Sequence, residues 1–381
     1  MRISLRRTAR CGPDTLGAAV ERTAVQPRLK DRSRKALRCF FAPLAALALA
    51  GATPAAEPDE LVIFNWSQYL APEVVAAFEA ETGARVRVVH YGGDDHRDQL
   101  MVETDGEGFD VIVVSGTTIE TYGKRGWIQP LQEELIPNLR HIDPRWRDAY
   151  AATREYAVPY FWGTVGIAYR RDLVPEPITS WMQLYRPAPE LQGRIKMPNT
   201  ARDVLGMALK ALGHSMNTDD PEKLKEAGRL ALAQKPAVSV YSYISLGEGS
   251  ALVSGKTAAA MVYGGDALNV AQHHEDIVYV LPEEGGGIWC DYLTVGANAP
   301  HPELAHEFID FINRPDIAAQ QAEYMYLGSP NRAARERIDP EILSNPIVYP
   351  DADALAKSEY YRPLSPELLR LQSRIFTHIV E

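Results

Sequence analysis

Residues 110–115 read Asp-Val-Ile-Val-Val-Ser, and this short run already indicates the class of fold. A nearly unbroken apolar run that ends in a polar residue is typical of a parallel strand buried on both faces. Upstream, residues 61–66 and 85–91 have the composition of strands, and residues 72–81 place their apolar side chains on one side of a helix. These successive β-α units predict an open α/β sheet. Ligands bind such sheets beyond the carboxyl ends of the strands.

The middle of the chain repeats this alternation, which suggests a second α/β lobe. Two long β segments, at about residues 160–170 and 287–296, are predicted to cross between the lobes. We expect residues 56–165 and 292–381 to form the first lobe and residues 166–291 to form the second. A further strand is predicted at 257–263, and helices at 202–212, 221–232, 302–313 and 316–324.

The N-terminal 55 residues differ in charge from the rest of the chain. They hold eleven of the 40 basic residues and three of the 50 acidic ones, which leaves a net charge of −18 for residues 56–381. Basic residues 32–38 precede an apolar run at 39–50, and small residues follow it at 51–56. This order is typical of a secretory signal, and the apolar run is too short to span a bilayer. We therefore expect a periplasmic protein without residues 1–55.

The composition of the predicted mature chain excludes several classes of protein. An acidic chain lacks the basic face that nucleic-acid binding requires. Cys290 is the one cysteine left after residue 55, so disulfides cannot stabilise the fold and its hydrophobic core must do so. No later apolar stretch approaches the length of a membrane span. We expect a soluble, exported monomer.

Motifs for catalysis, metals or cofactors are weak or absent in the sequence. The run Ser254-Gly255-Lys256-Thr257 lacks the glycine five positions before Gly255 that a phosphate-binding loop needs. His273-His274-Glu275 are adjacent, so on a helix they would point in different directions. The sequence contains no nucleophile elbow, zincin motif or dinucleotide fingerprint. We therefore expect no catalysis, no metal and no cofactor.

Aromatic and acidic residues gather at the predicted strand ends. They are Trp66-Ser67-Gln68-Tyr69, Tyr263 with Asp266, and Trp289 with Asp291. Aromatic faces attract ammonium groups by about 0.5–2 kcal/mol, and carboxylates add charge-assisted hydrogen bonds. Such a set suits an alkylammonium ligand, although core aromatics beside surface acids would give the same composition.

Several motifs in this order resemble the spermidine/putrescine-binding proteins of bacterial ABC transporters. The resemblance runs through most of the mature chain, and its motifs are Asn65–Tyr69, Asp110–Ser115, Val158–Thr164, Pro282–Asp291, Ser329–Ala334 and Tyr349–Ala352. It implies a type II periplasmic-binding-protein fold, in which two α/β lobes joined by crossover strands close on the ligand. It also implies a membrane permease as partner.

The same resemblance assigns roles to individual residues. Trp66 and Tyr69 are expected to form an aromatic wall, and Ser67, Ser115 and Thr117 to supply polar contacts. Carboxylates for the ammonium groups are expected from Asp203, Asp266 and Asp291, beside the pocket aromatics Tyr263 and Trp289. Tyr361 falls near a late polar contact.

Two positions depart from the family pattern. Gln68 stands where relatives carry Asp or Glu, and Thr200 stands where spermidine binders carry Asp. A neutral side chain cannot compensate a buried ammonium group. We predict the substrate-binding component of an importer for putrescine- or spermidine-like cations. The alternatives are a sensor of the same fold, a binder of another cationic or zwitterionic solute, and a hydrolase that uses Asp203, Asp266 or Asp291 as acid and base.

Overall fold

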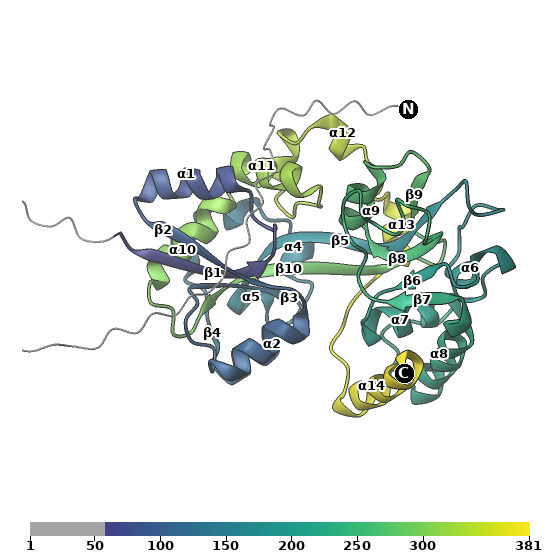
Figure 1. The fold of residues 1–381 in the computed structure, drawn as a ribbon. Helices are drawn as coiled ribbons and strands as arrows, with labels where there is room; N and C mark the ends of the chain where they lie inside the picture. Colours follow the sequence, from purple (N-terminus) through teal and green to yellow (C-terminus); the bar gives the residue numbers. More distant parts are fainter. Residues whose placement is uncertain (1–57) are drawn as a thin grey trace, which may run out of the picture. The chain divides into compact units, whose positions relative to one another are not determined.

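The computed structural model describes residues 58–381, so the predicted signal sequence lies outside the described residues. The first third of this region alternates strands with helices, as the sequence predicts (Figure 1). Its elements are β1 (Glu60–Trp66), α1 (Pro72–Thr82), β2 (Arg85–Tyr91), α2 (Asp94–Glu103), β3 (Val111–Ser115), α3 (Ile119–Arg125), β4 (Ile128–Gln129), α4 (Pro144–Arg147) and α5 (Thr153–Tyr156).

The rest of the chain continues the mixture of strands and helices. Its elements are β5 (Ala157–Arg170), α6 (Trp181–Tyr185), β6 (Ile195–Met197), α7 (Ala201–Ala211), α8 (Pro221–Gln234), β7 (Val238–Tyr241), β8 (Ala259–Tyr263), α9 (Gly264–Ala271), β9 (Ile277–Val280), β10 (Gly287–Gly296), α10 (Pro302–Ile312), α11 (Pro315–Met325), α12 (Pro340–Leu343), α13 (Ala352–Lys357), β11 (Glu359–Tyr360) and α14 (Pro366–Val380).

A mixed sheet connects these elements in the order β2-β1-β3-β10-β5-β8-β6-β7. The strands β2, β1 and β3 are parallel, as are β8, β6 and β7, whereas β10 and β5 run antiparallel to their neighbours in this order. Outside this order, the short β11 pairs with the start of β10 in parallel. The predicted α/β class is therefore confirmed. Because β1 and β3 are parallel neighbours, the residues at their carboxyl ends, Trp66 and Ser115, lie at one edge of the sheet.

The long strands β5 and β10 join the two parallel groups. The first half of β5 pairs with β10 through residues 157–164, and its second half pairs with β8 and β9 through residues 165–170. These are the two segments that the sequence predicts as crossovers. In Figure 1 both strands run from the elements around β1 to those around β8.

The hydrophobic core forms separate clusters around the first and second halves of the crossover strand β5. Leu61, Phe78 and Phe308 belong to a cluster built mainly from β1, β3, α1, α10 and α11. Trp181 and Leu205 belong to another, built mainly from α6, α7, α8 and β8.

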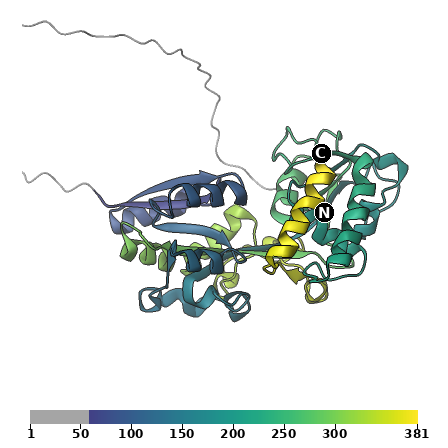
Figure 2. The same cartoon turned by 90° about the horizontal axis from the view of Figure 1, so that it is seen from below.

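The C-terminal helix α14 packs with the second of these clusters. Leu368 and Ile379 lie in it, and α14 contacts α7 and α8 (Figure 2). The sequence placed residues 292–381 with the first lobe. The lobe boundaries remain a prediction, and we propose that α14 belongs to the second lobe.

Candidate binding site

Asp291 lies in β10, where it is opposite Ser115 of β3 on one side and Phe161 of β5 on the other. The register with β5 shifts between Asp291 and Tyr292, an irregularity of the kind that redirects side chains. The hydroxyl of Tyr69 donates a hydrogen bond to Asp291 Oδ2 over 2.9 Å. Two predicted site residues that are distant in sequence therefore meet in the structure.

Burial governs the ionisation of Asp291, which is 8% exposed. It raises the pKa of the carboxyl group to about 7, although the hydrogen bond from Tyr69 lowers the pKa. Asp94 raises it further through charge repulsion, and Arg97 lowers it. An opposite charge beside Asp291 would favour its ionised form.

A second carboxylate, Asp203, lies in the first turn of α7. It is 3% exposed and accepts hydrogen bonds from Tyr263 over 2.8 Å and from Tyr361 over 2.5 Å. Burial raises its pKa, against the hydrogen bonds from Tyr361, Tyr263 and Thr200. Thr200 caps α7, since its hydroxyl accepts a hydrogen bond from the backbone N–H of Asp203. Thr200 therefore has a local structural role, which an aspartate at this position could also fill.

Trp289 lies in β10 two residues before Asp291 and contacts Tyr263, a hydrogen-bond partner of Asp203. Its half-buried side chain packs against both core clusters, and its ring meets Tyr263 edge-on with centroids 6.2 Å apart. The indole also lies over Gly163 of β5, where an added Cβ would come within 2.6 Å of it. The buried Nε1 has no hydrogen-bond partner within residues 58–381. Trp289 and Asp291 lie inside β10 rather than at its end, unlike the sequence prediction.

Asp266 is the third predicted carboxylate, and it lies in the first turn of α9 just after β8. Together with Asp203, Tyr243 and Tyr263 it lines a pocket. Burial raises its pKa to about 6. The structure therefore brings Asp266 together with Asp203 and Tyr263 at one pocket.

The remaining predicted residues are more exposed. Trp66 ends β1 and packs on Tyr91, with ring centroids 4.6 Å apart. Ser67 and Gln68 are exposed in the loop after it, and Gln68 has a left-handed backbone with φ of 57°. Within the described chain, the side chains of Ser67 and Gln68 make no hydrogen bond. The structure does not join them to Asp291 or Asp203.

The chemistry of this arrangement favours a cation. In the described part of the chain, none of Asp203, Asp266 and Asp291 forms an ion pair. Aromatic rings and hydroxyl groups surround these carboxylates. A ligand with ammonium groups would supply the missing positive charge, and its methylene groups could pack on the rings. The described residues contain no cluster of three or more His, Cys, Asp or Glu side chains suited to a metal.

Comparison with known proteins identifies the family. Residues 73–350, well over half of the chain, match the model of the bacterial extracellular solute-binding proteins. The chain belongs to this family. It is a family of solute-binding proteins, not a family of enzymes.

Individual relatives of this solute-binding protein cover most of its length. The spermidine/putrescine-binding periplasmic protein of Escherichia coli (strain K12) is 33% identical, over 83% of this chain and 91% of its own. The norspermidine sensor of Vibrio cholerae is 32% identical, over 84% and 88%. The solved spermidine/putrescine ABC transporter substrate-binding protein PotD of Streptococcus pneumoniae is 26% identical, with a TM-score of 0.75 over 84% of this chain and 98% of that one. These likenesses confirm the predicted type II periplasmic-binding-protein fold.

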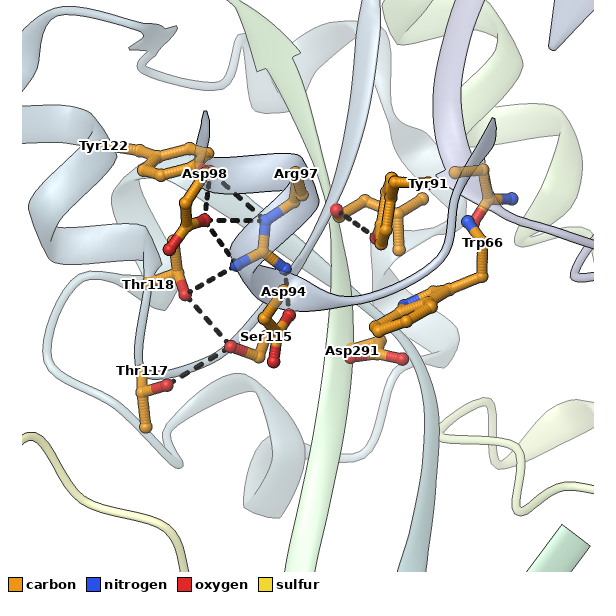
Figure 3. A network of polar contacts seen from close by, with 12 residues as sticks. Trp66, Tyr91, Asp94, Arg97, Asp98, Ser115, Thr117, Thr118, Tyr122 and Asp291 are labelled. Atoms are coloured by element: carbon orange, nitrogen blue, oxygen red, sulfur yellow. Dashed lines mark hydrogen bonds and ion pairs between the residues drawn. The ribbon is translucent and has the colours of Figure 1, made fainter. Parts of the chain in front are cut away.

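Ser115 and Thr117 of this solute-binding protein belong to a polar network that the sequence did not reveal. Arg97 of α2 is 1% exposed, and its guanidinium group forms ion pairs with Asp94 and Asp98 (Figure 3). It also donates to Tyr122 and, over 3.3 Å, to Thr118, whose hydroxyl lies 3.0 Å from that of Ser115. The hydroxyl of Thr117 lies 3.2 Å from the same Ser115 oxygen. The guanidinium group thereby helps to fix hydroxyls at the carboxyl end of β3.

Two tyrosines join the predicted carboxylates: Tyr361, which the sequence places only near a late polar contact, and Tyr243, for which the sequence carries no signal. Tyr361 follows β11, which pairs with the start of β10, and this pairing brings Tyr361 near Asp203. Neither tyrosine lies in a motif that marks a contact with Asp203 or Asp266. A basic residue amid three aspartates at 94–98 was the one available signal for Arg97.

No helix within residues 58–381 is long and apolar enough to cross a membrane.

Proposed function

We propose that this chain is the periplasmic polyamine-binding component of an ABC importer, exported by its N-terminal segment. The observation that carries the proposal is the position of Trp289 between two buried carboxylates: it precedes Asp291 by two residues in β10, and its ring contacts Tyr263, a partner of Asp203. Asp291 is bound by one tyrosine and Asp203 by two, and Trp289 packs with the core clusters on both sides. A flexible diamine or triamine could place one ammonium group at each carboxylate and its methylene groups against the indole.

The raised pKa values of the carboxyl groups support a cationic ligand. Burial disfavours the charged forms of Asp203, Asp266 and Asp291, and a bound ammonium group would reverse that effect. A neutral sugar would leave these groups uncompensated. The names of the relatives from Escherichia coli and Streptococcus pneumoniae point to the same ligand class.

Residues Trp66, Ser67, Gln68, Tyr69, Ser115, Thr117, Asp203, Tyr263, Asp266, Trp289 and Asp291 are proposed as the ligand-binding set. Tyr361 and Tyr243 are added because they adjoin Asp203 and Asp266. Ligand binding would favour a closed arrangement of the lobes, which the permease would then recognise. We expect a monomer that binds no nucleic acid and turns over no substrate.

A polyamine sensor is the second candidate, because the relative from Vibrio cholerae is named a norspermidine sensor. The two roles can be separated in cells. Deletion of the gene abolishes uptake of radiolabelled putrescine or spermidine if the protein serves an importer. It leaves uptake intact if the protein serves only a sensor.

A thermal-shift screen tests the ligand class. The purified protein is unfolded and refolded to remove bound solute, then heated with putrescine, cadaverine, spermidine, norspermidine or spermine. Choline, amino acids and sugars serve as controls. A ligand at 100 times its dissociation constant adds about 2.7 kcal/mol to the free energy of unfolding. A shift with the amines alone supports the proposal, and a shift with another solute alone overturns it. Recovery of the amine unchanged by mass spectrometry tests the absence of catalysis.

A further inference from the structure

The loop between β1 and α1, which carries Ser67, Gln68 and Tyr69, is bound by a side chain from a distant helix. Gln321 of α11 is 1% exposed. Its Oε1 accepts a hydrogen bond from the backbone N–H of Ala71 over 2.9 Å. Its Nε2 donates to the carbonyl oxygen of Tyr69 over 3.1 Å. One amide group thus binds the backbone of the loop on both sides of residue 70.

Tyr160 of β5 completes this arrangement. Gln321 Nε2 donates to the Tyr160 hydroxyl over 2.8 Å, and that hydroxyl donates to the same Tyr69 carbonyl over 2.8 Å. The rings of Tyr160 and Tyr69 pack edge-on, with centroids 5.7 Å apart. Tyr69 is therefore fixed at its carbonyl oxygen by two donors, while its hydroxyl binds Asp291.

The exposed part of the loop is not anchored by its own side chains. The left-handed backbone of Gln68 is uncommon for a residue other than glycine and persists where surrounding contacts impose it. Ser67 and Gln68 are exposed, so their side chains do not anchor the loop in the core. On either side of these two residues, Trp66, Tyr69 and Leu70 pack against the core, and Gln321 and Tyr160 hold the backbone by hydrogen bonds at Tyr69 and Ala71.

We propose that Gln321 is a positioning residue for the amine site, acting through Tyr69 on Asp291. It fixes the backbone of Tyr69, and this in turn holds the Tyr69 hydroxyl against the carboxylate. The inference rests on the proposed function for the identity of the ligand. Among the proposed ligand-binding residues, Gln321 hydrogen-bonds only Tyr69 within the described chain, through the backbone carbonyl.

The contrasting role is one of packing alone, in which Gln321 satisfies the buried N–H of Ala71 and stabilises the fold. Such a role would lower stability without any specific link to Tyr69. A double-mutant cycle separates the two roles, because it measures whether the effect of one residue requires the other.

The cycle combines Gln321→Met with Tyr69→Phe, and calorimetry measures the affinity for putrescine and spermidine. Gln321→Met alone should weaken binding about tenfold, and in the Tyr69→Phe background it should weaken binding less than twofold. Gln234→Met is the matched control, since Gln234 is also 1% exposed and donates to a backbone carbonyl, that of Leu184. Its affinity should stay within twofold of the wild type. An equal loss for Gln321→Met in both backgrounds, or no loss at all, would overturn the proposal.

A milder variant guards against misfolding of Gln321→Met. Tyr160→Phe removes one of the two donors to the Tyr69 carbonyl and leaves the other in place. It should weaken amine binding two- to fourfold, and this loss should vanish in the Tyr69→Phe background. A loss that persists there would contradict the proposed route through Tyr69.

A readout without ligand distinguishes failure of this proposal from failure of the proposed function. The carboxyl carbon of Asp291 is titrated by NMR in the ligand-free protein. Because the hydrogen bond from Tyr69 lowers the pKa of Asp291, its loss in Gln321→Met or Tyr69→Phe should raise the midpoint, and Gln234→Met should leave it unchanged. The titratable or charged groups that interact electrostatically with Asp291, and that could also move its midpoint, are Tyr69, Asp94, Arg97, Tyr91, Tyr150, Tyr160 and Cys290.

The two tests together decide both proposals. If the wild type binds no amine, the proposed function fails, and the titration still decides the role of Gln321. If the wild type binds amines and the Asp291 midpoint is unchanged in Gln321→Met, the positioning role fails alone.

Discussion

The hydroxyl of Tyr69 donates to the carboxylate of Asp291 over 2.9 Å, across 222 positions of sequence. This contact joins the loop after β1 to the crossover strand β10. The hydrogen bond from Tyr69 orients one oxygen of the carboxylate and leaves the other oxygen for a ligand. Asp203 accepts a tyrosine hydrogen bond at each of its two oxygens, so tyrosine hydroxyls contact the carboxylates at both ends of the proposed site.

Replacing Asp291 tests the most direct ligand contact. Asp291→Asn removes the charge and keeps the shape of the side chain, so it should cost about 1.5–3 kcal/mol of amine affinity. Calorimetry with putrescine at pH 8 measures the loss. Ser67→Ala, at an exposed residue, serves as the comparison. A larger loss for Ser67→Ala than for Asp291→Asn would remove Asp291 from its leading role.

Amine binding should depend on pH through the same carboxylates. The pKa of Asp291 is raised to about 7 and that of Asp266 to about 6, so both groups take up protons as the pH falls from 8 to 5. Protonation removes the negative charge, and affinity for a cation should fall over this range. Affinities measured at each pH for the wild type and Asp291→Asn test this. The variant retains Asp266, so a wild-type profile no steeper than that of the variant would contradict the assignment of Asp291.

The stability of the ligand-free protein should show the opposite trend. A carboxyl group whose pKa is higher in the folded state binds more protons when folded than when unfolded. Between about pH 4 and pH 7, the contribution of Asp291 to the free energy of unfolding therefore falls as the pH rises. Thermal unfolding should show the wild type losing stability relative to Asp291→Asn from pH 5 to pH 8. A constant difference between the two would refute the raised pKa.

The contribution of Trp289 to amine binding can be tested by removing its indole ring and by forcing the ring to shift. Trp289→Ala should weaken amine binding at least tenfold while the fold persists. Gly163→Ala should also weaken binding, because its Cβ would lie 2.6 Å from the indole and force the ring to shift. Gly126→Ala, which meets no neighbouring atom within 4 Å but needs a left-handed backbone, controls for glycine replacement in general. Unchanged affinity in Trp289→Ala would exclude the indole from the site.

Replacing Gln68 tests whether the missing acid at this position affects amine binding. Gln68→Glu adds a carboxylate to the exposed loop after β1 and should strengthen binding of a triamine such as spermidine, if that loop faces an ammonium group of the ligand. The diamine putrescine should gain less. Calorimetry with both ligands measures the difference, and equal affinities before and after the change would place residue 68 outside the site.

The α/β class and most strand positions could be predicted because they follow from local patterns. The run at 110–115 is apolar on both faces, and β3 is a buried parallel strand. Helix α2 was missed because residues 94–103 are mostly polar and show no apolar stripe. The contacts of the C-terminal α14 with α7 and α8 could not be predicted, since an amphipathic stripe shows that a helix is covered but not which elements cover it.

The sequence by itself determined the alternation of strands and helices and the segments in which aromatic and acidic residues gather, since both depend on residue type and spacing. Tertiary structure alone decided the pairings that form the candidate site. Tyr69 meets Asp291 and Tyr361 meets Asp203 because the order of strands brings distant segments together. The amide of Gln321 meets the loop after β1 for the same reason. Hydrogen bonds of this kind depend on the positions of atoms within about 3 Å, and local sequence patterns do not encode such positions.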